Sequence, residues 1–101
     1  MTRVRVMAWD GIPAQVKAFP DEGDPRSVML DPWFSEHIDR VAMQRGLLGS
    51  DAYLELWDWG PDEEVDEPDP LAAAEARKAE IETVWAPRRA AWEQGADPES
   101  I

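Results

Sequence analysis

An acidic, proline-rich stretch at residues 61–70 limits the folds that are open to this chain. It reads PDEEVDEPDP, with six acids, three prolines and one hydrophobic residue. Repulsion between neighbouring carboxylates and the missing N–H of proline both disfavour regular structure there. We therefore predict three segments, namely a folded body over residues 1–60, an extended linker over residues 61–70 and a helical tail over residues 71–101.

Charge and composition exclude several classes of function. The 101-residue chain has 22 acids against ten Lys and Arg, a net charge of −12. Phosphates would be repelled, so nucleic acid and anionic membranes are disfavoured as partners. The absence of cysteine excludes disulfides and thiolate chemistry. Apolar runs are too short for a membrane span or a signal peptide, and we expect a cytoplasmic protein.

Alternating apolar residues near the N-terminus predict a small antiparallel sheet. Residues 3–9 and 14–19 both alternate with the period of two that is typical of half-buried strands. The connection Asp10–Pro13 is short enough for a hairpin. Residues 26–30 predict a third short strand.

Two helices should follow within the body. Asp31 is a good N-cap and Pro32 fits the first helical position, which predicts a helix from Pro32 to about Arg45. Ser50 is the predicted N-cap of a second helix over residues 51–59.

In the tail, we predict a helix from residue 71 to about residue 85. Pro87 should kink or break this helix. The predicted fold class is therefore α+β. A three-stranded antiparallel sheet packs with two helices in the order βββαα, and a C-terminal helix follows the acidic linker.

Tryptophan is unusually frequent for a chain of this length. The six residues are Trp9, Trp33, Trp57, Trp59, Trp85 and Trp92. A small core can hold only some of them, and we assign Trp9 and Trp57 to it. Trp33, Trp59 and Trp92 either contact a partner or pack between body and tail. In a helix, residues 57 and 59 would face different sides, which makes 56–60 a candidate interaction surface.

No arrangement of residues indicates catalysis. His37, the single histidine, is predicted to be a partly exposed structural residue. The acidic stretch lacks the glycine and the ligand spacing of an EF-hand. Phosphate-binding, dinucleotide and nucleophile motifs are absent from the sequence. We therefore expect no enzyme activity of its own, with no catalytic residue, no cofactor and no metal site.

One local pattern is similar to ribbon-helix-helix repressors. Strand 26–30, helix 32–45 and a helix capped by Ser50 follow in the same order as in those proteins. The resemblance implies a dimer that inserts the strand into the DNA major groove. Ser27 and Met29, or Arg26 after a change of register, would then face the bases. A DNA-binding dimer is accordingly the alternative function.

Several blocks resemble a small bacterial family described as virulence factor domain proteins. The blocks are Trp9–Lys17 (WDGIPAQVK), Phe34–Asp39 (FSEHID), Met43–Leu54 (MQRGLLGSDAYL) and Trp57–Gly60 (WDWG). They cover about residues 3–64. The resemblance implies a stand-alone accessory protein that accompanies one-carbon enzymes of the methylenetetrahydrofolate reductase or corrinoid methyltransferase type.

The favoured function is accordingly a non-catalytic accessory subunit that binds a larger protein. A proline-rigidified turn and an aromatic segment together predict a docking patch. The candidate partner-binding residues are Ile12, Pro13, Gln15, Trp33, Tyr53, Trp57 and Trp59. The tail could extend this contact, fold back on the body or pair with its counterpart in a homodimer.

Overall fold

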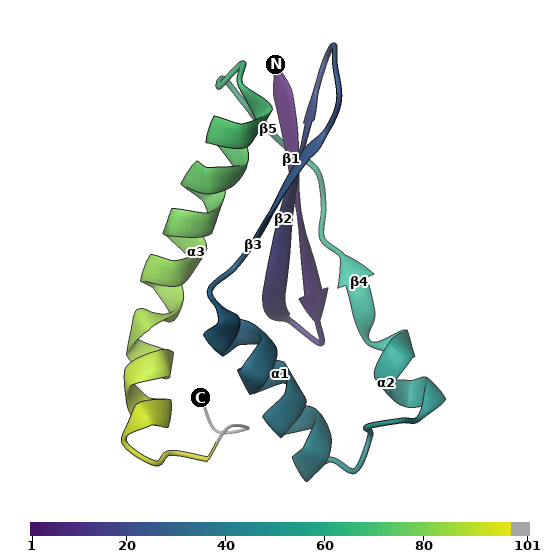
Figure 1. Cartoon of the computed structure of the whole chain (residues 1–101), viewed down its shortest axis with the longest axis vertical. Helices are drawn as coiled ribbons and strands as arrows, with labels where there is room; N and C mark the ends of the chain where they lie inside the picture. The colour runs from purple at the N-terminus through teal and green to yellow at the C-terminus, as the bar shows by residue number, and fades with distance from the viewer. Residues whose placement is uncertain (98–101) are drawn as a thin grey trace.

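The sheet grows from the hairpin of β1 (Thr2–Trp9) and β2 (Ile12–Pro20), in a computed structural model that describes residues 1–97 (Figure 1). The two strands are antiparallel, with Val4 opposite Ala18 and Val6 opposite Val16. This alternation places the small apolar residues of both strands on one face, as predicted.

The hairpin turn consists of Asp10 and Gly11. Both residues have positive φ, 47° and 86° respectively. Two such residues in succession are typical of a type I′ turn, whose twist matches that of the strands on either side. The short connection that was predicted between the first two strands is therefore confirmed.

The sheet has five strands rather than the predicted three, although the α+β class is confirmed. Strand β3 (Arg26–Met29) lies at one edge, in the order β3-β2-β1-β4. The other edge of β1 pairs with two short strands, β4 (Trp57–Trp59) and β5 (Glu63–Val65).

Strand β4 replaces the end of a predicted helix. Helix α2 (Asp51–Glu55) is capped by Ser50 as expected, but it ends at Glu55 rather than at residue 59. Trp57 and Trp59 lie opposite Trp9 and Met7 of β1. Residues two apart in a strand share a face, so the prediction that residues 57 and 59 face different sides was wrong.

Strand β5 lies inside the stretch that was predicted to lack regular structure. Its three residues pair with Thr2–Val4 of β1. Two arginines of β1, Arg3 and Arg5, form ion pairs with Asp62. Arg77 contacts Glu63 at 2.7 Å. These bases, distant in sequence, offset the local repulsion that argued against a strand.

Helix α1 (Pro32–Gln44) begins and ends where the sequence predicted. The Asp31 side chain accepts a hydrogen bond from the Trp33 N–H at 3.0 Å. Gly46 follows the last turn with a φ of 69°, and its N–H donates to the Met43 carbonyl. A glycine in this left-handed conformation is a common way to end a helix.

Helix α3 (Pro70–Glu93) continues through Pro87, so the predicted break does not occur there. Pro87 is exposed, so its ring meets solvent rather than the core. Ala73 and Ala74 are buried in the same cluster as Val4 and Val16 of the sheet. Residues assigned to a separate tail therefore contribute to the core under the sheet.

Two adjoining clusters form the core. The first joins the sheet to α1 and α3, and its larger members are Val4, Val16, Leu30, Trp33 and Phe34. The second lies under the hairpin turn and consists of Trp9, Ile12, Ala14, Ile38, Val41 and Ala42.

The tryptophans are distributed between buried and half-buried positions. Trp9 is fully buried, as predicted, and Trp33 is 4% exposed. Trp57, which was predicted to be a core residue, is half-buried against the second cluster. The other three indoles are also half-buried.

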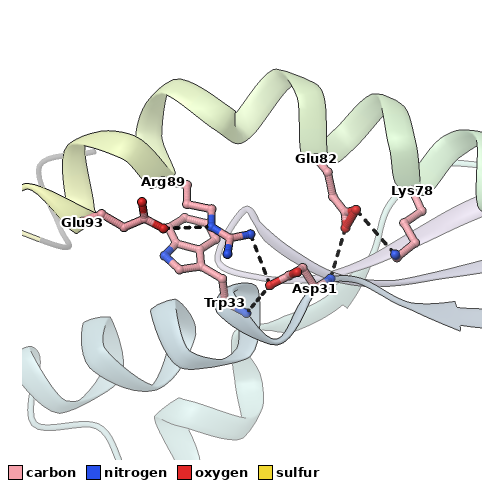
Figure 2. A network of polar contacts seen from close by, with 6 residues as sticks. All are labelled: Asp31, Trp33, Lys78, Glu82, Arg89 and Glu93. Carbon is pink, nitrogen blue, oxygen red and sulfur yellow. Dashed lines mark hydrogen bonds and ion pairs between the residues drawn. The ribbon is translucent and has the colours of Figure 1, made fainter.

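A polar network joins the start of α1 to the C-terminal half of α3 (Figure 2). Asp31 contacts the Arg89 guanidinium at 3.3 Å, and its backbone N–H donates to Glu82 at 3.2 Å. Arg89 also donates to Glu93 at 3.2 Å. The hydrogen bond from the Trp33 N–H, aided by Arg89, lowers the pKa of Asp31 below its ordinary value.

We expect the Asp31→Ala substitution to lower the free energy of unfolding by about 1 kcal/mol, because it leaves the first N–H groups of α1 without a cap. Asp31→Asn should cost less than about 0.5 kcal/mol, because Asn caps equally well and an exposed ion pair contributes little. Urea denaturation of both variants measures the difference. Equal losses would show that the ion pair, and not the cap, is the stabilising contact.

Within residues 1–97, no helix has both the length and the apolar character needed to cross a bilayer.

Candidate functional site: a groove between β1, β4 and α3

Helix α3 covers only part of the sheet face on which it packs. It lies mainly over β2 and β3 and makes fewer contacts with β1. Figure 1 shows that α3 slants away from the β1–β2 hairpin toward its C-terminal end. A groove of about 690 Å³ remains between this half of α3 and the strands β1 and β4.

The lining of the groove is mostly apolar. Val6 and Ala8 of β1 contribute from the sheet, and Ile81, Val84 and Trp85 contribute from α3. The Val84 side chain is 67% exposed. The α3 residues lie three and four positions apart, so they form one stripe along the helix. Val84 thus extends the apolar lining to the open side of the groove.

The rim of the groove carries an excess of negative charge. Four carboxylates line it, those of Asp10, Glu55, Asp58 and Glu80, against the single guanidinium of Arg77. Asp10 contacts Arg45 at 2.6 Å. Among residues 1–97, Glu55 and Asp58 form no ion pair. A ligand with positive charge on its sides would therefore meet two uncompensated carboxylates.

Arg77 closes the groove at one end and is held from two sides. Its guanidinium donates to Glu63 at 2.7 Å and to Glu80 at 3.2 Å. The Nε atom is buried and has no hydrogen-bond partner within the described residues. Arg77 thus connects β5, through Glu63, to α3, and it keeps the two elements in fixed relation at this end.

The structure places two of the seven predicted partner-binding residues in the groove. Pro13 and Trp59 line it. Ile12 lies beneath the turn as a core residue, 8% exposed. Gln15 is half-buried in the middle of the sheet, opposite Met7 on one side and Met29 on the other.

The remaining predicted residues lie in two aromatic groups outside the groove. Trp33 is buried between α1 and α3. Tyr53 packs against Trp9, with ring centroids 5.7 Å apart, and against Trp57 at 6.3 Å. Trp33 belongs to the first core cluster, whereas Tyr53 and Trp57 are half-buried against the second.

Sequence reasoning missed the α3 wall of the groove. Ile81, Val84 and Trp85 form a thin apolar stripe on a helix that was predicted to be a tail. Such spacing indicates one apolar face, but not which part of that face meets the sheet. The position of α3 over β2 and β3 decides that Val84 stays open.

His37 is buried, 1% exposed, which corrects the prediction of a partly exposed residue. Its ring stacks on Trp33, with centroids 4.9 Å apart and planes 7° apart, and Trp85 meets it edge-on at 6.2 Å. Its Nδ1 has no hydrogen-bond partner among the described residues. Burial, aided by the charge of Arg88, lowers the pKa of His37 below its ordinary value.

The lowered pKa of His37 predicts a pH-dependent stability. The unfolded chain takes up a proton on His37 near pH 6.5, whereas the folded chain takes it up only at lower pH. The stability of the folded chain that depends on neutral His37 is fully present above about pH 6.5. It is lost as the pH falls toward the pKa of His37 in the folded chain. We expect the melting temperature to fall between pH 7.5 and 5.5, above the range in which ordinary carboxylates titrate.

His37→Phe keeps an aromatic ring on Trp33 and removes the titrating group. This variant should lose most of the change in melting temperature between pH 7.5 and 5.5. If its pH dependence matches that of the original chain, groups other than His37 are responsible.

No group of three or more His, Asp or Glu residues within residues 1–97 is arranged to hold a metal ion. The groove itself contains carboxylates, one guanidinium and no histidine.

A family model described as "Virulence factor" matches residues 7–89 of the chain. The matched range extends beyond the blocks at residues 3–64 on which the resemblance rested, and it includes most of α3. Every lining residue of the groove except Val6 therefore lies within it. No curated protein and no solved structure matches the chain.

Proposed function

The chain belongs to the virulence factor family, and from this premise we propose that it is a non-catalytic subunit that binds another protein through the groove between β1, β4 and α3. The observation that carries the proposal is the uncovered half of the sheet face. There Val84 is 67% exposed, beside the half-buried Ile81 and Trp85. Burying such apolar area is the usual driving force of protein association.

One-carbon enzymes of the folate or corrinoid methyl-transfer type, which the family resemblance implies, are the first candidates for the partner. This part of the proposal rests on that resemblance and on no contact in the groove. A homodimer is the other candidate assembly. Sedimentation at two protein concentrations separates a homodimer from a monomer that needs a different partner.

Capture of proteins from a lysate of the native host tests the proposal. We expect Val84→Lys to reduce the amount of captured partner roughly tenfold, because it places a charge inside the apolar contact. Val84 is exposed on the surface of α3, so the substitution should leave the melting temperature nearly unchanged.

Leu54→Lys is the matched control. Leu54 lies in α2, is 65% exposed and does not line the groove. The two variants add the same charge at residues of similar exposure, so a difference between them reports on the groove alone. Equal capture by both variants would contradict the proposal.

The alternative of a ribbon-helix-helix-like DNA-binding dimer has no specific observation in its favour. Strand β3 pairs with β2 of its own chain, with Ser27 and Met29 exposed. A hollow beside Met29 is lined by Glu75, Lys78 and Glu82 of α3. Lys78 pairs with Glu82 at 3.5 Å, which leaves Glu75 as the carboxylate that would repel phosphates. Salt-sensitive retardation of a promoter fragment would be the observation that favours this alternative.

A further inference from the structure

We propose that the groove accepts one amphipathic helix of a partner protein, with apolar residues on the face that enters the groove and Lys or Arg residues along both sides. This inference rests on the proposed function and specifies the chemistry of the bound segment. Three features of the groove lead to it: its width, the arrangement of its apolar lining and the charge of its rim.

The width of the uncovered face corresponds to one helix. Neighbouring strands lie about 4.8 Å apart, so two strands present a strip about 10 Å wide. An α-helix with its side chains has a diameter of about 10–12 Å. Since α3 lies mainly over β2 and β3, the strip over β1 and β4 has room for a second helix beside it.

The apolar lining has the shape that a helix would match. From Arg77 to Trp85 the α3 wall extends about 12 Å, or two helical turns. Opposite it, Val6 and Ala8 form a floor of small side chains that permits close approach, and Asp58 of β4 lies beside Ala8 at the edge of this floor. A partner helix with apolar residues at positions i, i+3 or i+4, and i+7 would cover Val84 and the floor together.

The charge of the rim selects a basic helix. Four rim carboxylates face one guanidinium, and that guanidinium is already paired with Glu63 and Glu80. The whole chain carries a net charge of −12, so a cationic segment is also attracted from a distance. Lys or Arg residues beside the apolar stripe would reach Glu55 and Asp58, which make no ion pair among residues 1–97.

Other occupants fit these features less well. An extended peptide binds by adding a strand to a sheet edge, whereas this groove lies over the face of the sheet. A second copy of this chain would bring another −12 charge toward an acidic rim.

Three synthetic helical peptides of about four turns each test the inference. The first combines a leucine face with lysine sides, the second has glutamate in place of lysine, and the third has alanine in place of leucine. We expect the leucine–lysine peptide to bind the intact chain at least roughly tenfold more tightly than either of the others. Titration calorimetry at physiological salt gives the three dissociation constants.

One variant inside the groove and one outside it test whether the peptide binds in the groove. Val84→Lys should weaken binding of the leucine–lysine peptide roughly tenfold, and Leu54→Lys should change it less than about twofold, although both raise the net charge equally. Equal weakening in the two variants would overturn the inference, because it would show attraction by net charge alone. Equal or tighter binding of the glutamate peptide, or no binding of any peptide, would also overturn it.

Failure of this inference is distinguishable from failure of the proposed function. If Val84→Lys loses a host partner that Leu54→Lys retains, while the leucine–lysine peptide does not bind, the groove is a docking site for a different segment. If sedimentation shows a dimer that Val84→Lys dissociates, a second copy occupies the groove and the basic helix is excluded.

Discussion

A chain that ends after residue 69 is expected to lack a cooperative unfolding transition. The truncation removes α3, including Ala73 and Ala74, and uncovers the face of the sheet that contains Val4 and Val16. Each large apolar side chain that returns to water costs about 1.5–3 kcal/mol, whereas a whole domain is stable by only about 5–15 kcal/mol. Thermal and urea denaturation followed by circular dichroism make the measurement.

A chain that ends after Asp97 is the control for this truncation, because it keeps every helix and strand of the structure. It should unfold cooperatively. Cooperative unfolding of the shorter chain would contradict our expectation. It would support the division into a body that folds alone over residues 1–60 and a separate tail.

The Trp9→Ala substitution is expected to lower the free energy of unfolding by about 3–5 kcal/mol. Trp9 is fully buried, and its Nε1 donates a hydrogen bond to the Tyr53 carbonyl at 2.9 Å. The substitution therefore opens a cavity next to Ile12 and Ile38 and removes one of the two hydrogen bonds that the part-buried Tyr53 carbonyl accepts. Urea denaturation gives the loss, provided that the variant still folds at low temperature.

Trp57→Ala is the comparison for Trp9→Ala. Trp57 packs against the same cluster but is half-buried, so its removal should cost less than that of Trp9. Trp9→Phe should fall between the two, because it keeps most of the apolar contact and loses the hydrogen bond. Equal losses at positions 9 and 57 would show that burial does not distinguish the two indoles.

Strand β4 shows why local periodicity misled the prediction over residues 51–59. Tyr53, Leu54 and Trp57 have helical spacing, and Ser50 does cap a helix there. The Asp10 N–H donates to the Leu56 carbonyl at 3.0 Å, directly before β4 pairs with β1. The open edge of β1 thus offers backbone hydrogen bonds to residues 57–59. Because β1 is distant in sequence, the local spacing of apolar residues cannot reveal this pairing.

In helix α3, too, contacts with a distant segment outweigh a local sequence signal, here that of Pro87. Proline removes one hydrogen bond of the helix ladder, which was the reason to expect a kink or break. Trp85 and Trp92, on either side of Pro87, both contact Trp33, with ring centroids 6.3 and 6.1 Å away. These contacts attach α3 to α1 on both sides of Pro87, and the helix continues through that residue.

The features that the sequence alone determined are those in which near neighbours along the chain decide the outcome. They include the alternation of β1 and β2, the caps at Asp31 and Ser50, the end of α1 at Gly46 and the α+β class. Each depends on backbone conformation or on hydrogen bonds within a few residues, and such interactions can be read from a short window.

The tertiary structure alone decided the features in which distant segments meet. Strands β4 and β5 form because β1 offers them an unpaired edge, and His37 is buried because α3 closes over α1. The groove exists because α3 lies over β2 and β3 rather than over the centre of the sheet. Apolar spacing shows that a helix has a face to bury, but the relative placement of helix and sheet determines how much of that face remains for a partner.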